Sequence, residues 1–389
     1  MSELEASTYT QQLEDMIFNM TADDYDYGAG KIAEFLNSDN ILPFSGRLLS
    51  FYNSVTGNNF TASEAKSDLL KRGKEKGIPF NRNTLENWFN GTTVPKFGDK
   101  DRENMFKIAF ALELDCGSTE DFFYKVFLDR AFNLRNPHEF IFAYCIINGK
   151  PYSEACTLIG VLNGKTGTRP TASDDTVFTS VINDFVWNAE DDSQVIDFIL
   201  ENPHNFSLNS TKAKENIKII LDKLTGSDET KGYAEREMRL YDVDTGKDSP
   251  FFGKNPHSTD FVLFTILGFG REHAEITKEL SNTFRKEISV QFPDSQSLSP
   301  NVNSSYVLRK VLILLFFYRF WIESKLKCKA SPDYEEYCEE MNDMLNESGY
   351  SPLYPGNPYD ALFLCCSAQS DPIDMFRELI SECFDEGSF

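Results

Sequence analysis

Histidine and paired cysteine are scarce in this chain of 389 residues, and their scarcity excludes several kinds of site. Only four histidines occur, and none stands in an H-E-x-x-H pattern. The eight cysteines include no C-x-x-C pair, whereas a metal ion needs clustered ligands. No G-x-S-x-G sequence marks a nucleophile. We therefore expect no metal, no cofactor and no catalytic residue.

Long apolar runs are also missing. The longest, from Val311 to Tyr318, is far short of the roughly 20 residues that a membrane-spanning helix needs. The segment Met1 to Glu5 is acidic and lacks the apolar core of a signal peptide. Most cysteines stand among apolar residues, as buried thiols do in a reducing compartment. These features predict a cytoplasmic protein that does not enter membranes.

Basic residues are the scarcer charge, since 38 Lys and Arg face 61 Asp and Glu and the net charge is −23. Such a protein is repelled by phosphate backbones, which argues against non-specific binding to nucleic acid. The charge is uneven, however. Residues 64–107 hold ten basic and seven acidic side chains, whereas residues 331–389 hold fourteen acids and one base. The single locally basic stretch is therefore near the N-terminus.

Strand-like alternation is scarce as well, and most segments repeat apolar residues at helical spacing. Thirty-four Phe and sixteen Tyr suggest that aromatic rings fill helix–helix interfaces. We predict an all-α protein of fifteen to eighteen helices, a repressor-like helix-turn-helix domain followed by a larger multi-helix domain. Several helix starts are marked by a cap before proline or by a capping box: Asn136-Pro137, Ser331-Pro332, Asn357-Pro358, Asp371-Pro372, and Ser118 with Asp121.

Polar breaks divide the chain into four expected regions. Residues 1–60 form an acidic N-terminal helix and loop, and residues 61–165 form the helix-turn-helix domain. Residues 171–241 form a central helical unit, and residues 257–389 form a C-terminal helical domain. A faint internal similarity also occurs, since Phe292 to Leu298 resembles Pro79 to Leu85 in placing a cap and a first-turn aliphatic residue before an apolar helix. This is either a degenerate second unit or chance.

The stretch from Asn81 to Pro95 carries the strongest functional signal. Asn81 can cap a short helix, and Gly91 can end it in a left-handed conformation. One face of this helix is apolar, with Leu85, Trp88 and Phe89 at helical spacing, and we expect Trp88 to pack against the helix of Phe106, Ile108 and Leu112. The other face holds side chains that can form hydrogen bonds to base edges: Arg82, Asn83, Glu86 and Asn87.

These residues resemble the lambda-repressor-like (Cro/XRE-type) helix-turn-helix family over roughly residues 44–132. Asn81, Arg82, Asn83, Thr84, Leu85, Trp88, Gly91 and Pro95 fall in the register of its recognition helix without a gap, and Met105 to Leu114 matches its fourth helix. The turn departs from the family pattern, because Pro79 and Phe80 make it two residues longer. The resemblance implies a DNA-reading helix, with phosphate contacts nearby from Lys71, Arg72, Lys74 and Lys76.

The expected function is therefore sequence-specific binding of double-stranded DNA by a transcriptional regulator, or by a control protein of a mobile element or phage process, acting as a possible homodimer. An alternative remains open for each feature. The four basic residues can be the solvated end of a helix. The protein can also be a non-enzymatic adaptor or inhibitor whose acidic C-terminal domain binds a protein partner, with the helix-turn-helix purely structural.

An enzyme is the weakest hypothesis. Gly160 to Thr166 looks like a phosphate-binding loop, but only three residues separate its glycines, where such a loop needs four. The residues before it read as a helix rather than as a buried strand. We therefore expect no nucleotide hydrolysis.

Overall fold

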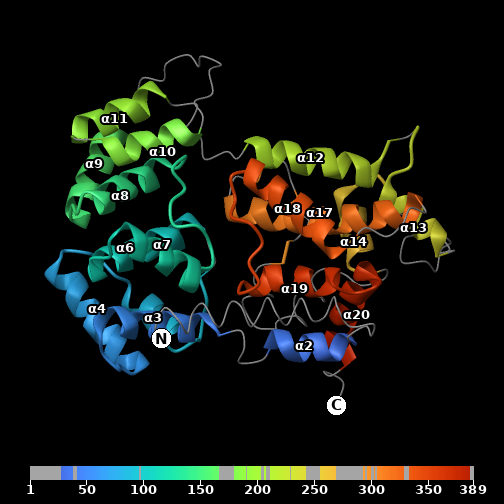
Figure 1. Ribbon diagram of the computed structural model, residues 1–389, viewed down its shortest axis with the longest axis horizontal. Coiled ribbons are helices and arrows are strands. Elements are labelled where there is room, and N and C mark those ends of the chain that lie inside the picture. The colour runs from blue at the N-terminus through green and yellow to red at the C-terminus, as the bar shows by residue number, and fades with distance from the viewer. Residues whose placement is uncertain are drawn as a thin grey trace. The chain divides into compact units, whose positions relative to one another are not determined.

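A computed structural model describes residues 28–37, 42–95, 98–165, 179–189, 191–202, 206, 211–227, 229–241, 255–268, 292–293, 296–298, 302, 305–327 and 333–385. These residues form 17 α-helices and one π-helical turn (Figure 1). No β-strand occurs among them, only an isolated bridge between Gly226 and Lys231. The predicted all-α class is confirmed for this part of the chain, whereas the predicted number of helices in the whole chain stays a prediction. None of its helices is long and apolar enough to cross a bilayer.

The chain folds as two compact units, a coarser division than the four expected regions, which stay a prediction. Unit 1 spans Phe44–Asn209. Its elements are α3 (Phe44–Thr56), α4 (Ala62–Glu75), α5 (Arg82–Phe89), α6 (Asp99–Leu112), α7 (Cys116–Phe122), the π-helical turn η1 (Phe123–Phe127), α8 (Pro137–Ile147), α9 (Tyr152–Lys165), α10 (Thr179–Asn188) and α11 (Asp192–Glu201).

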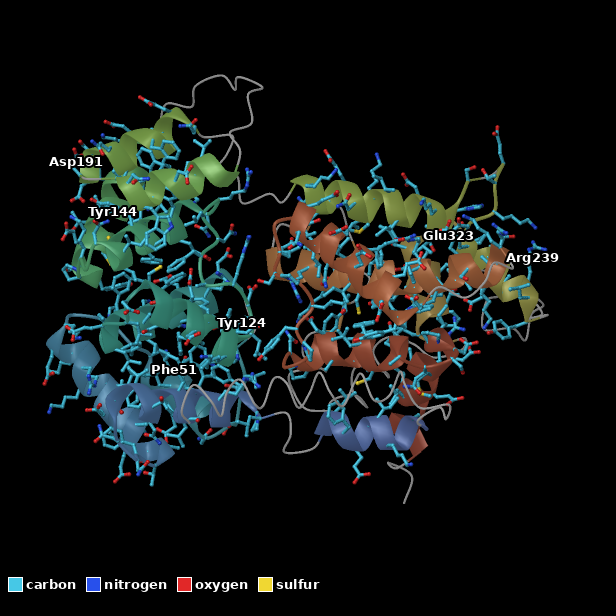
Figure 2. The ribbon with its side chains drawn as sticks, viewed as in Figure 1. Phe51, Tyr124, Tyr144, Asp191, Arg239 and Glu323 are labelled. Carbon is cyan, nitrogen blue, oxygen red and sulfur yellow. The ribbon has the colours of Figure 1, made fainter. Side chains whose placement is uncertain are left out.

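Aromatic rings fill the interior of unit 1, as the abundance of phenylalanine predicts. Phe51, labelled in Figure 2, comes from α3. Its ring centroid lies 5.0 Å from that of Phe122 of α7. Phe106 of α6 contacts Phe123 and Phe142 at 4.7 and 5.0 Å. The helices of unit 1 are thus held by rings that come from elements far apart in the sequence.

Unit 2 combines Ser2–Pro43 with Ser210–Phe389, so that unit 1 is an insertion between two of its segments. The first described helix, α2, packs against α19 and α20, although the sequence of unit 1 separates it from them. The elements of unit 2 are α2 (Ala29–Asn37), α12 (Thr211–Thr225), α13 (Tyr233–Leu240), α14 (Thr259–Ile266), α17 (Ser305–Lys327), α18 (Tyr334–Glu347), α19 (Pro358–Ser367) and α20 (Pro372–Asp385).

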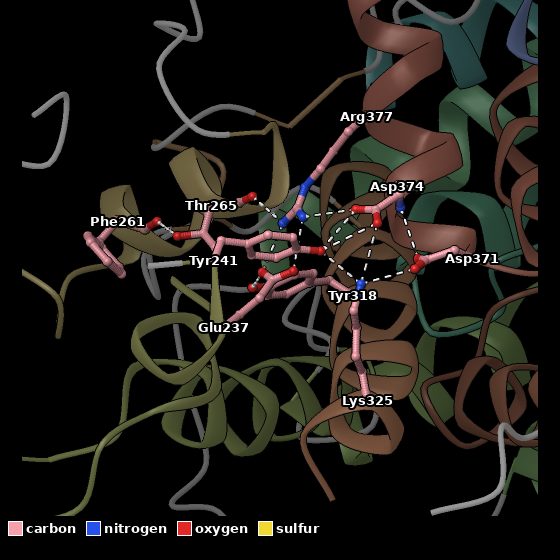
Figure 3. A network of polar contacts seen from close by, with 9 residues as sticks. All are labelled: Glu237, Tyr241, Phe261, Thr265, Tyr318, Lys325, Asp371, Asp374 and Arg377. Atoms are coloured by element: carbon pink, nitrogen blue, oxygen red, sulfur yellow. Dashed lines mark hydrogen bonds and ion pairs between the residues drawn. The ribbon is translucent and has the colours of Figure 1, made fainter. Parts of the chain in front are cut away.

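Helix α17 is the centre of unit 2. All residues from Val311 to Tyr318 are buried, and α12, α13, α18, α19 and α20 pack around the helix. A polar contact network joins three of these helices (Figure 3). Fully buried Glu237 accepts hydrogen bonds from Arg377 at 2.9 and 2.8 Å and from the Tyr318 hydroxyl at 2.6 Å. The buried Glu237 carboxylate is therefore paired and hydrogen-bonded.

Most of the expected helix starts are found where the sequence places them. Asn136 and Asn357 cap α8 and α19, each with proline at the first helical position. Asp371 accepts from the N–H of Asp374 at the start of α20. Ser331 and Pro332 lie outside the described residues. The expected capping box of Ser118 is wrong, because Asp115 caps α7 and accepts from the N–H of Ser118.

Candidate nucleic-acid interface

Helix α5 begins and ends as its local sequence predicts. The Asn81 side chain accepts a hydrogen bond from the N–H of Thr84 at 3.0 Å, which satisfies one of the free donors of the first turn. Gly91 follows the helix with a φ of 72°, a left-handed conformation that glycine adopts without strain. On the apolar face, Leu85 and Trp88 are 1 % and 2 % exposed. The burial of this face is therefore confirmed.

The partner of Trp88 differs from the expected one. Its ring meets Phe44 of α3 edge-to-face with 5.7 Å between centroids, and α3 and α4 are the elements that pack closely against α5. We expected the helix of Phe106 to cover it. Instead, Phe106 packs against rings of η1 and α8, namely Phe123 and Phe142. The ring of Phe106 thus contacts elements that follow α6 in the chain, while α4, which precedes α6, also packs against this helix.

The turn between α4 and α5 is held by three contacts. Gly77 takes a φ of 68°, and the N–H of Ile78 donates to the carbonyl of Gly73 at 2.8 Å, which closes the end of α4. The ring of Phe80 lies directly over Gly73, where an added Cβ would be 2.5 Å from ring atom Cδ2. Buried Ile78 adds an apolar contact. Of the two additional residues of this turn, Phe80 is therefore held by packing, whereas Pro79 is exposed.

The polar face of α5 is open to solvent. Arg82, Asn83 and Glu86 are exposed, and Asn87 is half-buried. The described residues offer no hydrogen-bond partner to the side chains of Arg82 and Asn83, so both keep their donors available. Three of the four predicted base-reading residues, Arg82, Asn83 and Asn87, thus share this face and form no ion pair with the described residues.

Glu86 is the exception, because it is bound to Lys66 of α4. The Lys66 Nζ lies 2.6 Å from the Glu86 carboxylate and is itself buried, with the residue 8 % exposed. The hydrogen bond and the charge of Lys66 lower the pKa of Glu86, and Arg82 adds to this. The carboxylate therefore has an internal partner, and its negative charge is offset before any phosphate approaches.

The four predicted phosphate contacts fall into two pairs. Arg72 donates to Asp68 of the same helix at 2.8 Å, and Lys76 donates to the carbonyl of Ala111 in α6 at 3.0 Å, so both are already engaged within the protein. Lys71, with its side chain 73 % exposed, has only a 4.0 Å contact with Glu75. Lys74 is exposed and forms no ion pair within the described ranges. Lys71 and Lys74 are therefore the two cations available to a ligand.

The Asp68 carboxylate is the group that binds the Arg72 side chain. Its carboxylate accepts hydrogen bonds from Arg72 and, at 2.7 Å, from the buried Tyr52 hydroxyl of α3. Burial alone would raise the pKa of Asp68, but these two hydrogen bonds and the charge of Arg72 outweigh it and lower the pKa. The trio ties α3 to α4 underneath the turn.

Lys66 is the residue that the sequence analysis missed. It reads there as one of many helical lysines, and its partner lies in the next helix, so no local pattern distinguishes it. Its burial and its short contact with Glu86 make it the residue that aligns α4 with α5.

Two features that the sequence raised in connection with enzymes can be compared with the described residues. Gly160 and Gly164 lie inside α9, so the segment that resembles a phosphate-binding loop is helical and cannot wrap a phosphate with its N–H groups. Within the described ranges, no group of three or more His, Cys, Asp or Glu side chains could hold a metal ion.

Comparison with known proteins finds no matching family, no similar curated protein and no similar solved structure. An assignment of function therefore rests on the geometry of α4 and α5.

Proposed function

We propose that α4, the turn after it and α5 form a helix-turn-helix that binds double-stranded DNA in a sequence-specific manner. The observation that carries the proposal is the division of α5 into two faces. Leu85 and Trp88 are buried, while Arg82 and Asn83 are exposed and make no hydrogen bond to the described protein. A helix fixed on one side, with free planar donors on the other, suits insertion into a major groove.

The chemistry of each side chain assigns its role. Arg82 can donate two hydrogen bonds to guanine, and Asn83 and Asn87 can each pair with adenine through donor and acceptor together. Lys71 and Lys74 contact the flanking phosphates. Arg72 and Lys76 support the fold from within, and Glu86 serves chiefly as the partner of Lys66.

The net charge defines how such a protein works. At −23, most of its surface repels DNA. Binding therefore needs the correct bases as well as phosphate contacts, which fits a cytoplasmic regulator or a control protein of a mobile element. Two modest sites add together in a homodimer that reads two half-sites.

The test is a selection of binding sequences from random duplex DNA, followed by titration of the selected duplex at increasing salt. Wild-type protein should bind the duplex, and the double variant Arg82→Ala/Asn87→Ala should not. Lys218→Ala on α12, which also removes one exposed positive charge, is the matched control and should bind as wild type does. The proposal is wrong if, at low salt, no DNA is held more tightly by the wild-type protein than by the double variant.

A second candidate function rests on α18. Six acidic side chains of this helix are exposed, and the helix carries no basic residue: Glu335, Glu336, Glu339, Glu340, Asp343 and Glu347. This face favours an adaptor that binds a basic protein. Neutralising these residues to Gln and Asn would then abolish partner binding, while Arg82→Ala/Asn87→Ala would preserve it.

A further inference from the structure

A buried arginine of α6 holds the start of α8. Arg102 forms a bidentate ion pair with Glu139, with Nε–Oε1 at 2.7 Å and Nη2–Oε2 at 2.8 Å. Its Nη2 also donates to the carbonyls of Arg130 and Ala131, at 3.1 and 2.9 Å. One guanidinium thus binds the first turn of a helix together with the loop that leads into it.

Unit 2 contains a similar arrangement, although Arg309 binds its carboxylate through Nη1 and Nη2, and Arg102 has an additional ion pair with Asp129 at 2.7 Å. Arg309 of α17 forms a bidentate ion pair with Asp360, both contacts being 2.8 Å. Its Nη2 also donates to the carbonyls of Ser351 and Pro352, at 3.2 and 3.1 Å. These two carbonyls precede Asp360 by the same number of residues by which those of unit 1 precede Glu139.

The correspondence extends to the backbone of the loop. In unit 1, the N–H of Asn133 donates to Glu139 at 2.8 Å. In unit 2, the N–H of Tyr354, at the equivalent position, donates to Asp360 at 3.0 Å. Asn136 and Asn357 then close the same turn, since the N–H of each donates to the carbonyl three residues earlier, at 2.7 and 2.9 Å. Each carboxylate is therefore held by two guanidinium nitrogens of one arginine and by one N–H of the loop.

The sequences of the two segments align without a gap. Residues 128–162 pair with residues 349–383, and both segments open on a left-handed residue, Leu128 with a φ of 61° and Gly349 with a φ of 75°. The identical positions are Asn136 and Asn357, Pro137 and Pro358, Phe142 and Phe363, Cys145 and Cys366, Pro151 and Pro372, Leu158 and Leu379, and Ile159 and Ile380.

A third Asn-Pro pair shows that the cap alone does not produce this arrangement. Asn255 and Pro256 precede α14, and the Asn255 side chain accepts from the N–H of His257. The side chains of Asn136 and Asn357 likewise accept from the N–H two residues later. Yet α14 is capped by Ser258 instead, and Asp260 in its first turn is exposed. The arginine and its four acceptors are therefore a shared property of the two aligned segments and do not follow from Asn-Pro.

We infer that unit 2 contains a second copy of the module that α6, α8 and α9 form in unit 1, with Arg309 and Asp360 as the counterparts of Arg102 and Glu139. In each copy the arginine is a positioning residue. It fixes the start of a buried helix and the loop before it. We name the pairs Arg102–Glu139 and Arg309–Asp360 the arginine clamps.

The second copy keeps the arginine clamp but not the basic helix. In unit 1 the clamp arginine follows α5 along the chain, whereas residues 292–304, which precede α17, contain no Lys or Arg. The similarity of Phe292 to Leu298 with Pro79 to Leu85 falls at this place, and Leu298 is buried as Leu85 is. On the proposed function, α5 is therefore the reading helix of the two aligned copies, and a two-fold symmetric site requires two chains.

The test uses the full chain and hydrogen exchange resolved by peptide, and it needs no DNA, so its outcome is separate from that of the proposed function. Glu139→Gln should speed exchange in residues 128–165 on the order of a hundredfold, because it removes the bidentate partner of a buried guanidinium and leaves it only the single contact with Asp129 at 2.7 Å. Asp360→Asn should do the same in residues 349–385. Neither should affect the other segment. Asp121→Asn, which breaks an exposed ion pair of unit 1, is the matched control and should change little.

Swapping the two acidic residues tests directly whether the two copies are equivalent. Glu139→Asp and Asp360→Glu each introduce the acid that the other copy uses. In each of these variants, hydrogen exchange of the affected segment should be at least about tenfold slower than in the corresponding neutral variant, Glu139→Gln or Asp360→Asn. The inference is overturned if these two variants are as disruptive as the neutral ones, or if either neutral variant leaves its own segment unchanged.

A segment exchange decides the matter if a neutral variant does not fold. Residues 349–360 replace residues 128–139 in one chain, and the same residues in scrambled order replace them in another. The first chain should unfold cooperatively near the wild-type temperature, and the scrambled one should not. Equal failure of both would show that the two segments are not interchangeable copies.

Discussion

Replacement of Trp88 by alanine tests whether α5 is held as described. The indole is 2 % exposed and lies edge-to-face with Phe44. Alanine would leave a cavity between α5 and α3 in place of the largest apolar side chain of the helix. Truncation of a buried Trp typically costs about 3–5 kcal/mol. Because about 1 kcal/mol shifts the melting temperature of a unit of this size by roughly 2–4 °C, the unit should melt roughly 6–20 °C lower.

The measurement is thermal unfolding followed by circular dichroism, with hydrogen exchange to assign the loss to unit 1. Trp187→Ala provides a matched control, because it is the same substitution at a residue that is 56 % exposed. An exposed site should change stability by no more than about 0.5 kcal/mol. The description of α5 is refuted if Trp88→Ala melts at the wild-type temperature, or if the two variants lose the same stability.

Three further variants test the interface and its support. Asn87→Ala should remove about 1–3 kcal/mol of discrimination at a single base pair, measured with duplexes that differ at one position, and an equal loss on all duplexes would contradict base reading. Gly73→Ala should cost about 1–3 kcal/mol of stability, because its Cβ would meet the Phe80 ring at 2.5 Å. Gly160→Ala is the control, a helical site with open space, and should stabilise the protein by about 0.5–1 kcal/mol. Similar melting temperatures of the two variants would be inconsistent with the packing of Phe80 on Gly73. The pKa of Asp68 is lowered in the folded state, so the ionised carboxylate stabilises the fold above its unfolded pKa of about 3.9, and this stabilisation is lost as the pH falls through the folded pKa. Asp68→Asn should therefore make the free energy of unfolding depend less steeply on pH below about pH 4. An unchanged pH dependence would disprove this linkage.

The limits of α5 follow from the sequence by itself. The cap at Asn81 and the left-handed end at Gly91 are formed by groups within a few residues of each other, so the local pattern is sufficient. The same holds for the proline-marked starts of α8 and α19. The spacing of Leu85 and Trp88 also predicts that they share a buried face, because helical periodicity alone puts them on one side.

What these faces contact was decided only by the tertiary structure. The burial of Trp88 follows from periodicity, but its packing on Phe44 does not, because an apolar face does not identify its partner helix. Lys66 and Glu86 look like ordinary exposed residues until the turn brings their helices together. The Arg102 clamp likewise joins residues from two helices and a loop. A side chain that pairs across elements depends on how the helices pack, and packing is a property of the whole unit, whereas a cap depends on one turn of the chain.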